Sequence, residues 1–315
     1  MVEIRTTPSP DTVYFEMNGT IPLSLIKEED GKGFSLSTLA LTPSVILPHE
    51  EKELHLGYYK PNQNQLKKPA IILLPITFGD YFTENLARYF ADKGFIVLRF
   101  PSRNELRIFS DESKNLTHFQ QILHDDILNV RKGLQWLKEQ PEVDPSRIGI
   151  MGISLGAILT SLMIEVETDF QAAVLFLGGG NLPGIFRTSK ERPIAGYRDR
   201  HIQKKLAKKT PTNEEWEIFL KEAHTALGKV DPLQYPSLLT PDRILMINGV
   251  FDTVIKRPYT KELWTHLGEP NLIYLPAGHY GSVLFFHYAR LKALKHFEAF
   301  IGVSLTRESP PTEGN

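Results

Sequence analysis

The pentapeptide at residues 152–156 is the feature that most constrains the fold of this chain. It reads Gly-Ile-Ser-Leu-Gly, with a strand-like apolar run (Ile148–Ile153) before Ser154 and a helix-like run (Leu155–Val166) after it. A serine on a sharp strand-to-helix turn projects its hydroxyl clear of the sheet, and glycine stands two residues to either side because a side chain there would collide with the turn. The spacing predicts a nucleophilic Ser154 and an oxyanion that faces the N–H of Leu155. The alternative is a serine in an ordinary glycine turn.

Length and composition exclude several classes of protein. The 315 residues suit one large α/β domain or two small ones. The formal net charge of -1 favours neither nucleic acid nor an anionic membrane as a partner, and the absence of cysteine excludes disulfides, thiolate metal sites and a cysteine nucleophile. Neither a signal peptide nor a membrane span is visible, so we expect a cytoplasmic protein that acts on a small molecule.

The order of the apolar runs predicts a mostly parallel sheet from residue 70 onward. Continuous runs at Ala70–Leu74, Phe95–Phe100 and Phe170–Leu177 are typical of strands buried on both faces. Two later runs, Ile244–Gly249 and Asn271–Leu275, continue the pattern, with helix-like segments between them. Right-handed βαβ crossovers then place helices on both faces of the sheet, and ligands bind at the carboxyl ends of its strands.

Three segments depart from this alternation. Phe34–Leu41 and Glu53–Tyr59 alternate between apolar and polar residues, which predicts antiparallel strands at one edge. Residues 182–238 are too long and too charged for a connection, so we expect a helical cap or lid within a single domain at 1–301. A solvated helical excursion that covers nothing is the alternative. Residues 302–315 are expected to form a flexible tail.

The remaining stretches carry weaker patterns. Residues 1–33 are mixed and rich in turn formers, and residues 101–116 indicate a polar loop. Thr117–Gln140 has the spacing of a long amphipathic helix.

A serine hydroxyl needs a general base, and the base needs an acid that orients it. In the strand–turn–helix architecture the acid and then the histidine follow on loops after later strands. Asp252 is the single acid in the loop after Ile244–Gly249, and His279 is the single histidine in the loop after Asn271–Leu275. The sequence therefore predicts a Ser154–His279–Asp252 triad. A surface role for Asp252 and a structural role for His279 are the alternatives.

The second oxyanion donor should come from the loop after Ala70–Leu74. Thr77 is the first candidate and Ile76 the next. No H-E-x-x-H or comparable ligand spacing occurs, so neither a metal nor another cofactor is expected. The expected pocket walls, each of which could equally belong to the core, are aromatic: Phe78, Tyr81, Phe82, Phe186 and Tyr280.

The segment from Trp136 to Gly156, with Asp-Pro-Ser-Arg-Ile at residues 144–148, resembles the dienelactone-hydrolase and prolyl-oligopeptidase-like branch of the α/β-hydrolase superfamily. Two later loops also match that family: its acid loop corresponds to Asn248-Gly249 and Asp252, and its base loop to Gly278-His279. The resemblance covers residues 34–301. Two positions depart from the pattern. Pro75-Ile76 stands where the family often has His-Gly, and Ser154 replaces the cysteine of dienelactone hydrolase itself.

The resemblance implies a serine hydrolase that cleaves carboxylic esters through an acyl-enzyme. Thioesters, peptides and acyl transfer stay open because the same triad serves them. A perhydrolase or cofactor-free haloperoxidase, and a non-catalytic ligand-binding protein on the same fold, are further alternatives. Residue types leave the substrate and the oligomeric state open.

Overall fold

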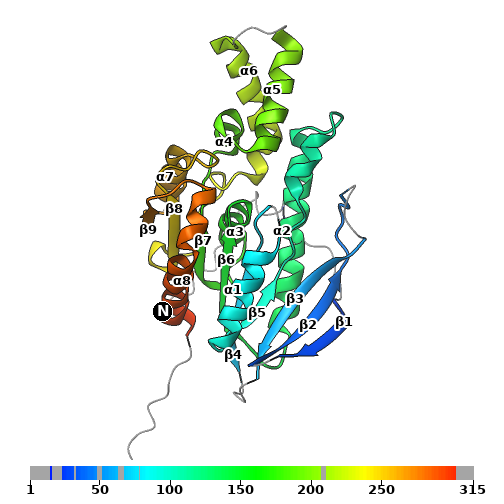
Figure 1. Ribbon diagram of the computed structural model, residues 1–315, viewed down its shortest axis with the longest axis vertical. Coiled ribbons are helices and arrows are strands. Elements are labelled where there is room, and N and C mark those ends of the chain that lie inside the picture. Colours follow the sequence, from blue (N-terminus) through cyan, green and yellow to red (C-terminus); the bar gives the residue numbers. More distant parts are fainter. Residues whose placement is uncertain are drawn as a thin grey trace, which may run out of the picture.

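A nine-stranded sheet crosses the molecule in the order β1-β2-β3-β5-β4-β6-β7-β8-β9 (Figure 1). The computed structural model describes Phe15 and residues 23–31, 33–47, 52–62, 67–77, 79–206 and 211–302. Strands β4 to β9 pair in parallel, whereas β1, β2 and β3 pair antiparallel along the N-terminal edge. This arrangement confirms the predicted mostly parallel α/β sheet with an antiparallel edge.

The strand bounds follow the apolar runs of the sequence closely. The strands are β1 (Ser24–Asp30), β2 (Phe34–Leu41), β3 (Leu54–Pro61), β4 (Lys68–Leu74), β5 (Ile96–Arg99), β6 (Val143–Ile153), β7 (Phe170–Phe176), β8 (Ile244–Gly249) and β9 (Asn271–Leu275). Strands β4, β5 and β8 are buried along their whole length, as expected of continuous apolar runs. Strand β1 was not predicted. All of its residues are exposed and it pairs only with β2, so it carries no burial pattern that the sequence could show.

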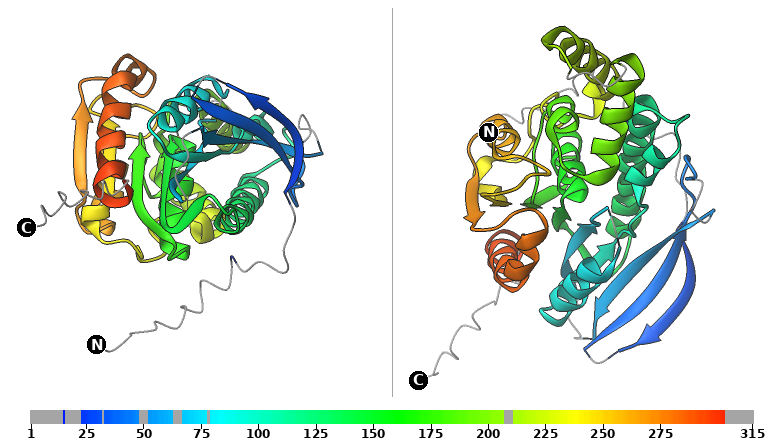
Figure 2. Two further views of the ribbon diagram at one scale, coloured as in Figure 1. Left: turned by 90° about the horizontal axis from the view of Figure 1, so that it is seen from below. Right: turned by 45° about the horizontal axis from the view of Figure 1, so that its top comes forward.

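Helices cover both faces of the sheet, as Figure 2 shows from two further directions. They are α1 (Tyr81–Asp92), α2 (Leu116–Lys138), α3 (Leu155–Val166), α4 (Leu182–Thr188), α5 (Arg192–Leu206), α6 (Asn213–Leu227), α7 (Arg257–His266) and α8 (Phe286–Ile301). The 3₁₀ helices that join them within the described ranges are η2 (Glu105–Ser110), η3 (Gly228–Val230), η4 (Pro241–Arg243) and η5 (Tyr280–Phe285). Within the described ranges no helix is both long enough and apolar enough to pass through a bilayer.

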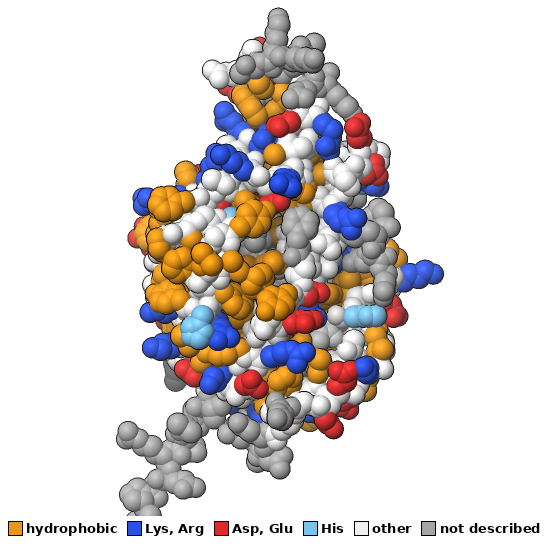
Figure 3. Space-filling view, in the orientation of Figure 1, with side chains coloured by type: hydrophobic (Ala, Val, Ile, Leu, Met, Phe, Trp, Pro, Cys, Tyr) orange, Lys and Arg blue, Asp and Glu red, His pale blue; other side chains and the backbone are white. Residues whose placement is uncertain are grey.

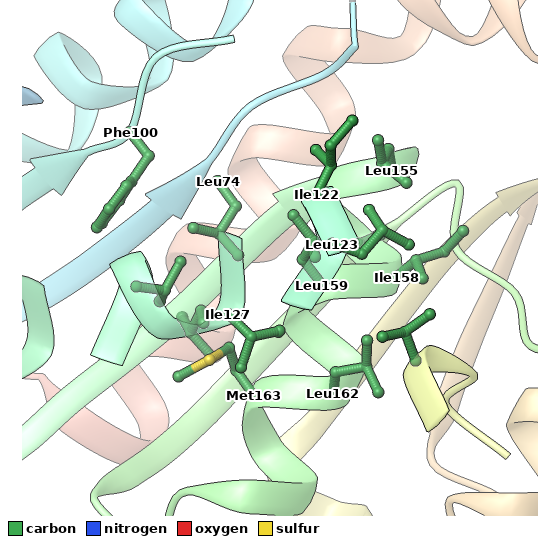
Figure 4. Close-up of a cluster of buried hydrophobic side chains, with 14 of the residues drawn as sticks. Leu74, Phe100, Ile122, Leu123, Ile127, Leu155, Ile158, Leu159, Leu162 and Met163 are labelled. Carbon is green, nitrogen blue, oxygen red and sulfur yellow. The ribbon is translucent and has the colours of Figure 1, made fainter. Parts of the chain in front are cut away.

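Two hydrophobic layers hold the helices to the sheet. On one face α2 and α3 pack over β4 and β6. Figure 4 shows buried side chains of α2, α3 and β4, with one from the residue after β5, in this layer: Leu74, Phe100, Ile122, Leu123, Ile127, Leu155, Ile158, Leu159, Leu162 and Met163. On the other face α1 and α8 meet the opposite side chains of the same strands, with Phe90 and Phe297 in edge-to-face contact at 5.7 Å. These layers fix α3, and with it the residues at its start.

The segment before α2 is not the polar loop that the sequence predicted. It contains η2, in which Leu106, Ile108 and Phe109 are buried. The Phe109 ring contacts the Phe186 ring of α4 at 5.6 Å. Arg103, two residues before η2, is buried as well. The apolar residues follow neither a helical nor a strand period, and their burial depends on contacts with distant elements.

Residues 182–238 form α4, α5, α6 and η3, which stand beyond the sheet at the top of Figure 1. Helical structure in this segment matches the prediction. The division of the chain into one domain with a cap remains a prediction. Residues 303–315 of the expected tail lie outside the described residues.

Candidate active site

Ser154 occupies the turn between β6 and α3. Its backbone has φ +58° and ψ -114°, a conformation that residues other than glycine rarely adopt. The Ser154 N–H donates to the carbonyl oxygen of Phe176 at 2.8 Å, so the turn is tied to the end of the neighbouring β7. The packing of α3 against the sheet holds this strained turn in place.

The two glycines of the pentapeptide have the steric role that their spacing predicted. A Cβ atom on Gly152 would lie 2.0 Å from the carbonyl oxygen of Gly156. A Cβ atom on Gly156 would lie 2.3 Å from the carbonyl oxygen of Pro75. In both cases the obstacle is backbone, which cannot turn aside as a flexible side chain can.

The structure brings Ser154, His279 and Asp252 together in one hydrogen-bonded chain. Ser154 Oγ lies 2.9 Å from His279 Nε2, and His279 Nδ1 lies 2.6 Å from Asp252 Oδ2. The side chains of His279 and Asp252 are only 8% and 1% exposed, so water scarcely competes for the contact between them. Ser154 and His279 are 125 positions apart in the sequence and meet because their loops follow strands of the same sheet.

Asp252 is oriented by its own loop. Its Oδ1 atom accepts the N–H groups of Val254 at 2.7 Å and Ile255 at 2.9 Å, which leaves Oδ2 to face His279. With its Nδ1–H donating to this carboxylate, the neutral imidazole presents an unprotonated Nε2 to the serine hydroxyl. The arrangement is chemically able to accept the proton of Ser154.

The loop after β4, which begins at Pro75, contributes to the same pocket as Ser154. Thr77 and Leu155 line the same pocket as Ser154. Ser102 anchors the loop: its hydroxyl donates to the Thr77 carbonyl at 2.8 Å, and its N–H donates to Asp80 Oδ1 at 2.8 Å. Helix α3 begins at Leu155, so the first N–H groups of that helix have no acceptor within it.

Ser154 and His279 open into a pocket of about 280 Å³. The wall of the pocket is hydrophobic except for Thr77, Ser154, Glu191, His279 and Tyr280. It includes side chains from α3, α4 and α5: Ile158, Leu182, Ile185, Phe186 and Ile194. It is a concave and mainly apolar site with a few polar groups, the usual form of a small-molecule site.

Three of the five predicted aromatic walls line this pocket: Phe82, Phe186 and Tyr280. Tyr81 does not. As the first residue of α1 its side chain is 72% exposed, with its ring against Phe82 at 5.4 Å. The prediction for Tyr81 was therefore wrong, because residue type alone does not give the direction of a side chain at a helix start. Phe78 lies outside the described residues.

Glu191 is a pocket residue that the sequence did not reveal. Its carboxylate is buried, accepts the hydroxyl of Tyr280, and takes a further hydrogen bond from the Arg192 N–H at 3.2 Å. Burial and the Glu191 carboxylate raise the pKa of Tyr280, so its hydroxyl stays protonated and donates. The contact ties the start of α5 to the residue next to His279. One acid between two basic neighbours, Lys190 and Arg192, forms no pattern from which this contact could be predicted.

Comparison with known proteins places the chain in a family. The model of the dienelactone hydrolase family matches residues 56–214, just over half of the chain and including the Ser154 turn. A protein of Mycobacterium tuberculosis described as uncharacterized is 26% identical over 156 residues, which are 49% of this chain. The match spans about a third of the length of that relative (33%).

Several solved structures share the fold. An acetyl xylan esterase from Paenibacillus sp. R4 has a TM-score of 0.61 at 16% identity, over 92% of each chain. Acetyl xylan esterase 1 from Thermoanaerobacterium sp. has a TM-score of 0.60 at 19% identity, over 90% of this chain and 94% of that one. The acylaminoacyl peptidase of Pyrococcus horikoshii has a TM-score of 0.60 at 18% identity, over 86% and 42% of the two chains. At these identities the likeness concerns the α/β-hydrolase fold. With this fold, and with a family model that covers the serine turn, the chain belongs to the dienelactone hydrolase family.

Proposed function

We propose that this protein is a serine hydrolase that cleaves carboxylic esters, with Ser154 as the nucleophile, His279 as the general base and Asp252 as the orienting acid. The observation that carries the proposal is the hydrogen-bonded chain from Ser154 Oγ through His279 to Asp252, with distances of 2.9 and 2.6 Å. Membership of the dienelactone hydrolase family supports hydrolytic chemistry.

The first half of the reaction forms an acyl-enzyme. Ser154 Oγ attacks the ester carbonyl carbon while its proton passes to His279 Nε2, and the imidazolium is stabilised by Asp252. Collapse of the tetrahedral intermediate breaks the bond to the alcohol oxygen, which leaves with the proton from His279. The acyl group then remains on Ser154.

The second half returns the enzyme to its starting state. Water attacks the acyl carbon and gives a proton to His279, and the second tetrahedral intermediate expels Ser154 Oγ, which recovers that proton. In both halves the negative charge grows on the former carbonyl oxygen. We assign its binding to the backbone N–H groups of Leu155 and Thr77, which flank Ser154 in the pocket wall.

The lining of the pocket favours a substrate with an apolar acyl or alcohol group. Its hydrophobic wall gives few partners to a strongly polar substrate, and a pocket of about 280 Å³ suits a small molecule. Residues 182–194 supply part of this wall, so we assign residues 182–238 as a cap on a single domain that ends near residue 301.

Ser154→Ala tests the proposal. We expect hydrolysis of p-nitrophenyl acetate, butyrate and octanoate to fall by about three or more powers of ten in kcat. A fluorophosphonate probe should label the parent protein and not the variant. Ser161→Ala is the matched control, because Ser161 lies on the same helix, binds the Ala157 carbonyl and is absent from the pocket wall.

Equal turnover by Ser154→Ala and the parent protein would exclude Ser154 as the nucleophile. Labelling without ester turnover would redirect the assignment to another acyl substrate, for which thioesters and peptide anilides belong in the same panel.

A further inference from the structure

Exposed hydrophobic side chains adjoin the pocket, because Tyr280 and Val283 belong to its wall and are also exposed. Figure 3 shows hydrophobic side chains gathered on one face of the molecule, over the region where Figure 1, in the same orientation, shows α8 and α1. The rim patch, as we call it, comprises six exposed hydrophobic residues of η5, α8 and the loop after β8, between 39% and 84% exposed: Phe251, Tyr280, Val283, Leu284, Tyr288 and Leu291. Hydrophobic side chains gathered in this number on one face mark a contact surface more often than chance.

Most of the rim patch follows the outer side of η5 and α8. Leu284, Tyr288 and Leu291 are three or four positions apart, so they form one outward stripe. The buried stripe of α8, which includes Ala293 and Phe297, faces the sheet. The helix is thus apolar on two sides, and the packing of the core accounts for only one of them.

The rim patch is continuous with the pocket. Tyr280 and Val283 belong to both the rim and the pocket wall. The Phe251 N–H donates to the Ala277 carbonyl at 3.0 Å, so Phe251 adjoins the loop that carries His279. An apolar path therefore runs from the outer surface of α8 to Ser154.

Positive charge stands beside this apolar stripe. Helix α8 contains Arg290, Lys292 and Lys295 and one acid, Glu298, in its last turn. The ammonium group of Lys292 lies over the Tyr288 ring at 5.3 Å from its centroid. Exposed leucine and aromatic side chains next to lysine and arginine are typical of helices that lie in the headgroup region of an anionic bilayer. The net charge of the whole chain hides this local excess.

We infer that the rim patch docks on the surface of an anionic lipid bilayer, with the pocket mouth toward the lipid. Leu284 and Tyr288 enter the headgroup region, and Lys292 and Lys295 meet the lipid phosphates. A protein bound firmly at this place would close the pocket mouth, whereas a lipid surface delivers apolar esters to it. The choice of a lipid surface over a protein as the occupant rests on the proposed function, and the description of the rim patch does not.

Flotation with vesicles tests the inference without any catalysis. The full chain carrying Ser154→Ala is mixed with phosphatidylcholine vesicles, with or without about 30% phosphatidylglycerol, and the floated fraction is measured at several salt concentrations. We expect binding to the anionic vesicles, weaker binding at high salt and little binding to the neutral ones. Leu284→Asp, added to the same chain, should lower the apparent affinity by about tenfold or more, since it removes an apolar contact and adds a repelled charge.

Ile218→Asp is the matched control, because Ile218 is an exposed apolar residue on α6, away from the rim patch. Its flotation should equal that of the Ser154→Ala parent. Absence of flotation, or equal flotation by the Leu284→Asp chain, would overturn the inference. Concentration-dependent dimers that Leu284→Asp abolishes, without vesicle binding, would overturn it in favour of a second copy as the occupant. If the Ser154→Ala chain floats but the protein with Ser154 intact hydrolyses no ester, the proposed function alone fails.

Discussion

We expect Glu105 to make the stability of this protein depend on pH across the neutral range. Its side chain is buried in η2 next to the Arg103–Asp126 ion pair, and Oε2 has no hydrogen-bond partner among the described residues. Burial, reinforced by the negative charge of Asp126, raises the pKa of Glu105 to about 8. The folded protein therefore keeps a proton on Glu105 under conditions in which the unfolded chain has released it.

The sign and size of the effect follow from proton linkage. Between the unfolded pKa of about 4.5 and the folded pKa of about 8, the folded state binds more protons, so the free energy of unfolding falls as the pH rises. The slope is about 1.4 kcal/mol for each pH unit, and the full window corresponds to at most roughly 5 kcal/mol. Glu105→Gln carries no titrating group and lacks this slope.

Urea unfolding followed by tryptophan fluorescence at pH 5, 6, 7 and 8 measures the difference. We expect the stability of Glu105→Gln relative to the parent protein to increase by a few kcal/mol from pH 5 to pH 8. Glu139→Gln, at an exposed position of the chain, is the control and should follow the parent at every pH. A difference between Glu105→Gln and the parent that stays constant over this range would refute the reasoning.

Three further changes test individual contacts of the site. Asp252→Asn should lower kcat for p-nitrophenyl esters by about 10⁴, because it disturbs the imidazole tautomer, while circular dichroism shows the fold intact. A loss of kcat below tenfold would argue against the triad. Gly156→Ala places a Cβ 2.3 Å from a backbone oxygen and should reduce the free energy of unfolding by about 3 kcal/mol, whereas Gly228→Ala, with nothing within 4 Å, should change it little. Tyr280→Phe removes the hydrogen bond to Glu191 and should lower kcat/KM several-fold, with Glu191→Gln giving a smaller loss; unchanged kinetics in both would show that this contact does not position the histidine loop.

The elements beside the serine were predictable because short stretches of sequence determine them. The limit on a side chain at Gly152 arises from atoms of the turn itself, whereas the limit at Gly156 arises from Pro75, directly after the neighbouring β4. The β6 and α3 runs on either side of the turn are local patterns of hydrophobicity. The positions of Asp252 and His279 after β8 and β9 were predictable for a related reason. Parallel strands end at the same edge of a sheet, so the order of elements along the chain indicates which loops meet.

No comparable signal exists in the sequence for contacts between segments that lack a periodic pattern of their own. Strand β1 is exposed along its whole length, so burial leaves no trace in its residues. The 3₁₀ helix η2 is buried by α2 and by the helices after β7, and neither neighbour can be identified from residues 101–116. Tyr81 and Phe82 are adjacent residues of one type, and only the packed structure separates the exposed ring from the pocket wall.

By itself, then, the sequence determined the strand–turn–helix at Ser154, the order of the three candidate catalytic residues and the class of fold, because local sterics and hydrophobic periodicity act over a few neighbouring residues. Only the tertiary structure decided the distances within the site, the Glu191–Tyr280 contact and the shape of the pocket. These depend on how elements 27 to 125 positions apart pack against one another. The free energy of that packing is shared among many side chains, so no single stretch of sequence records it.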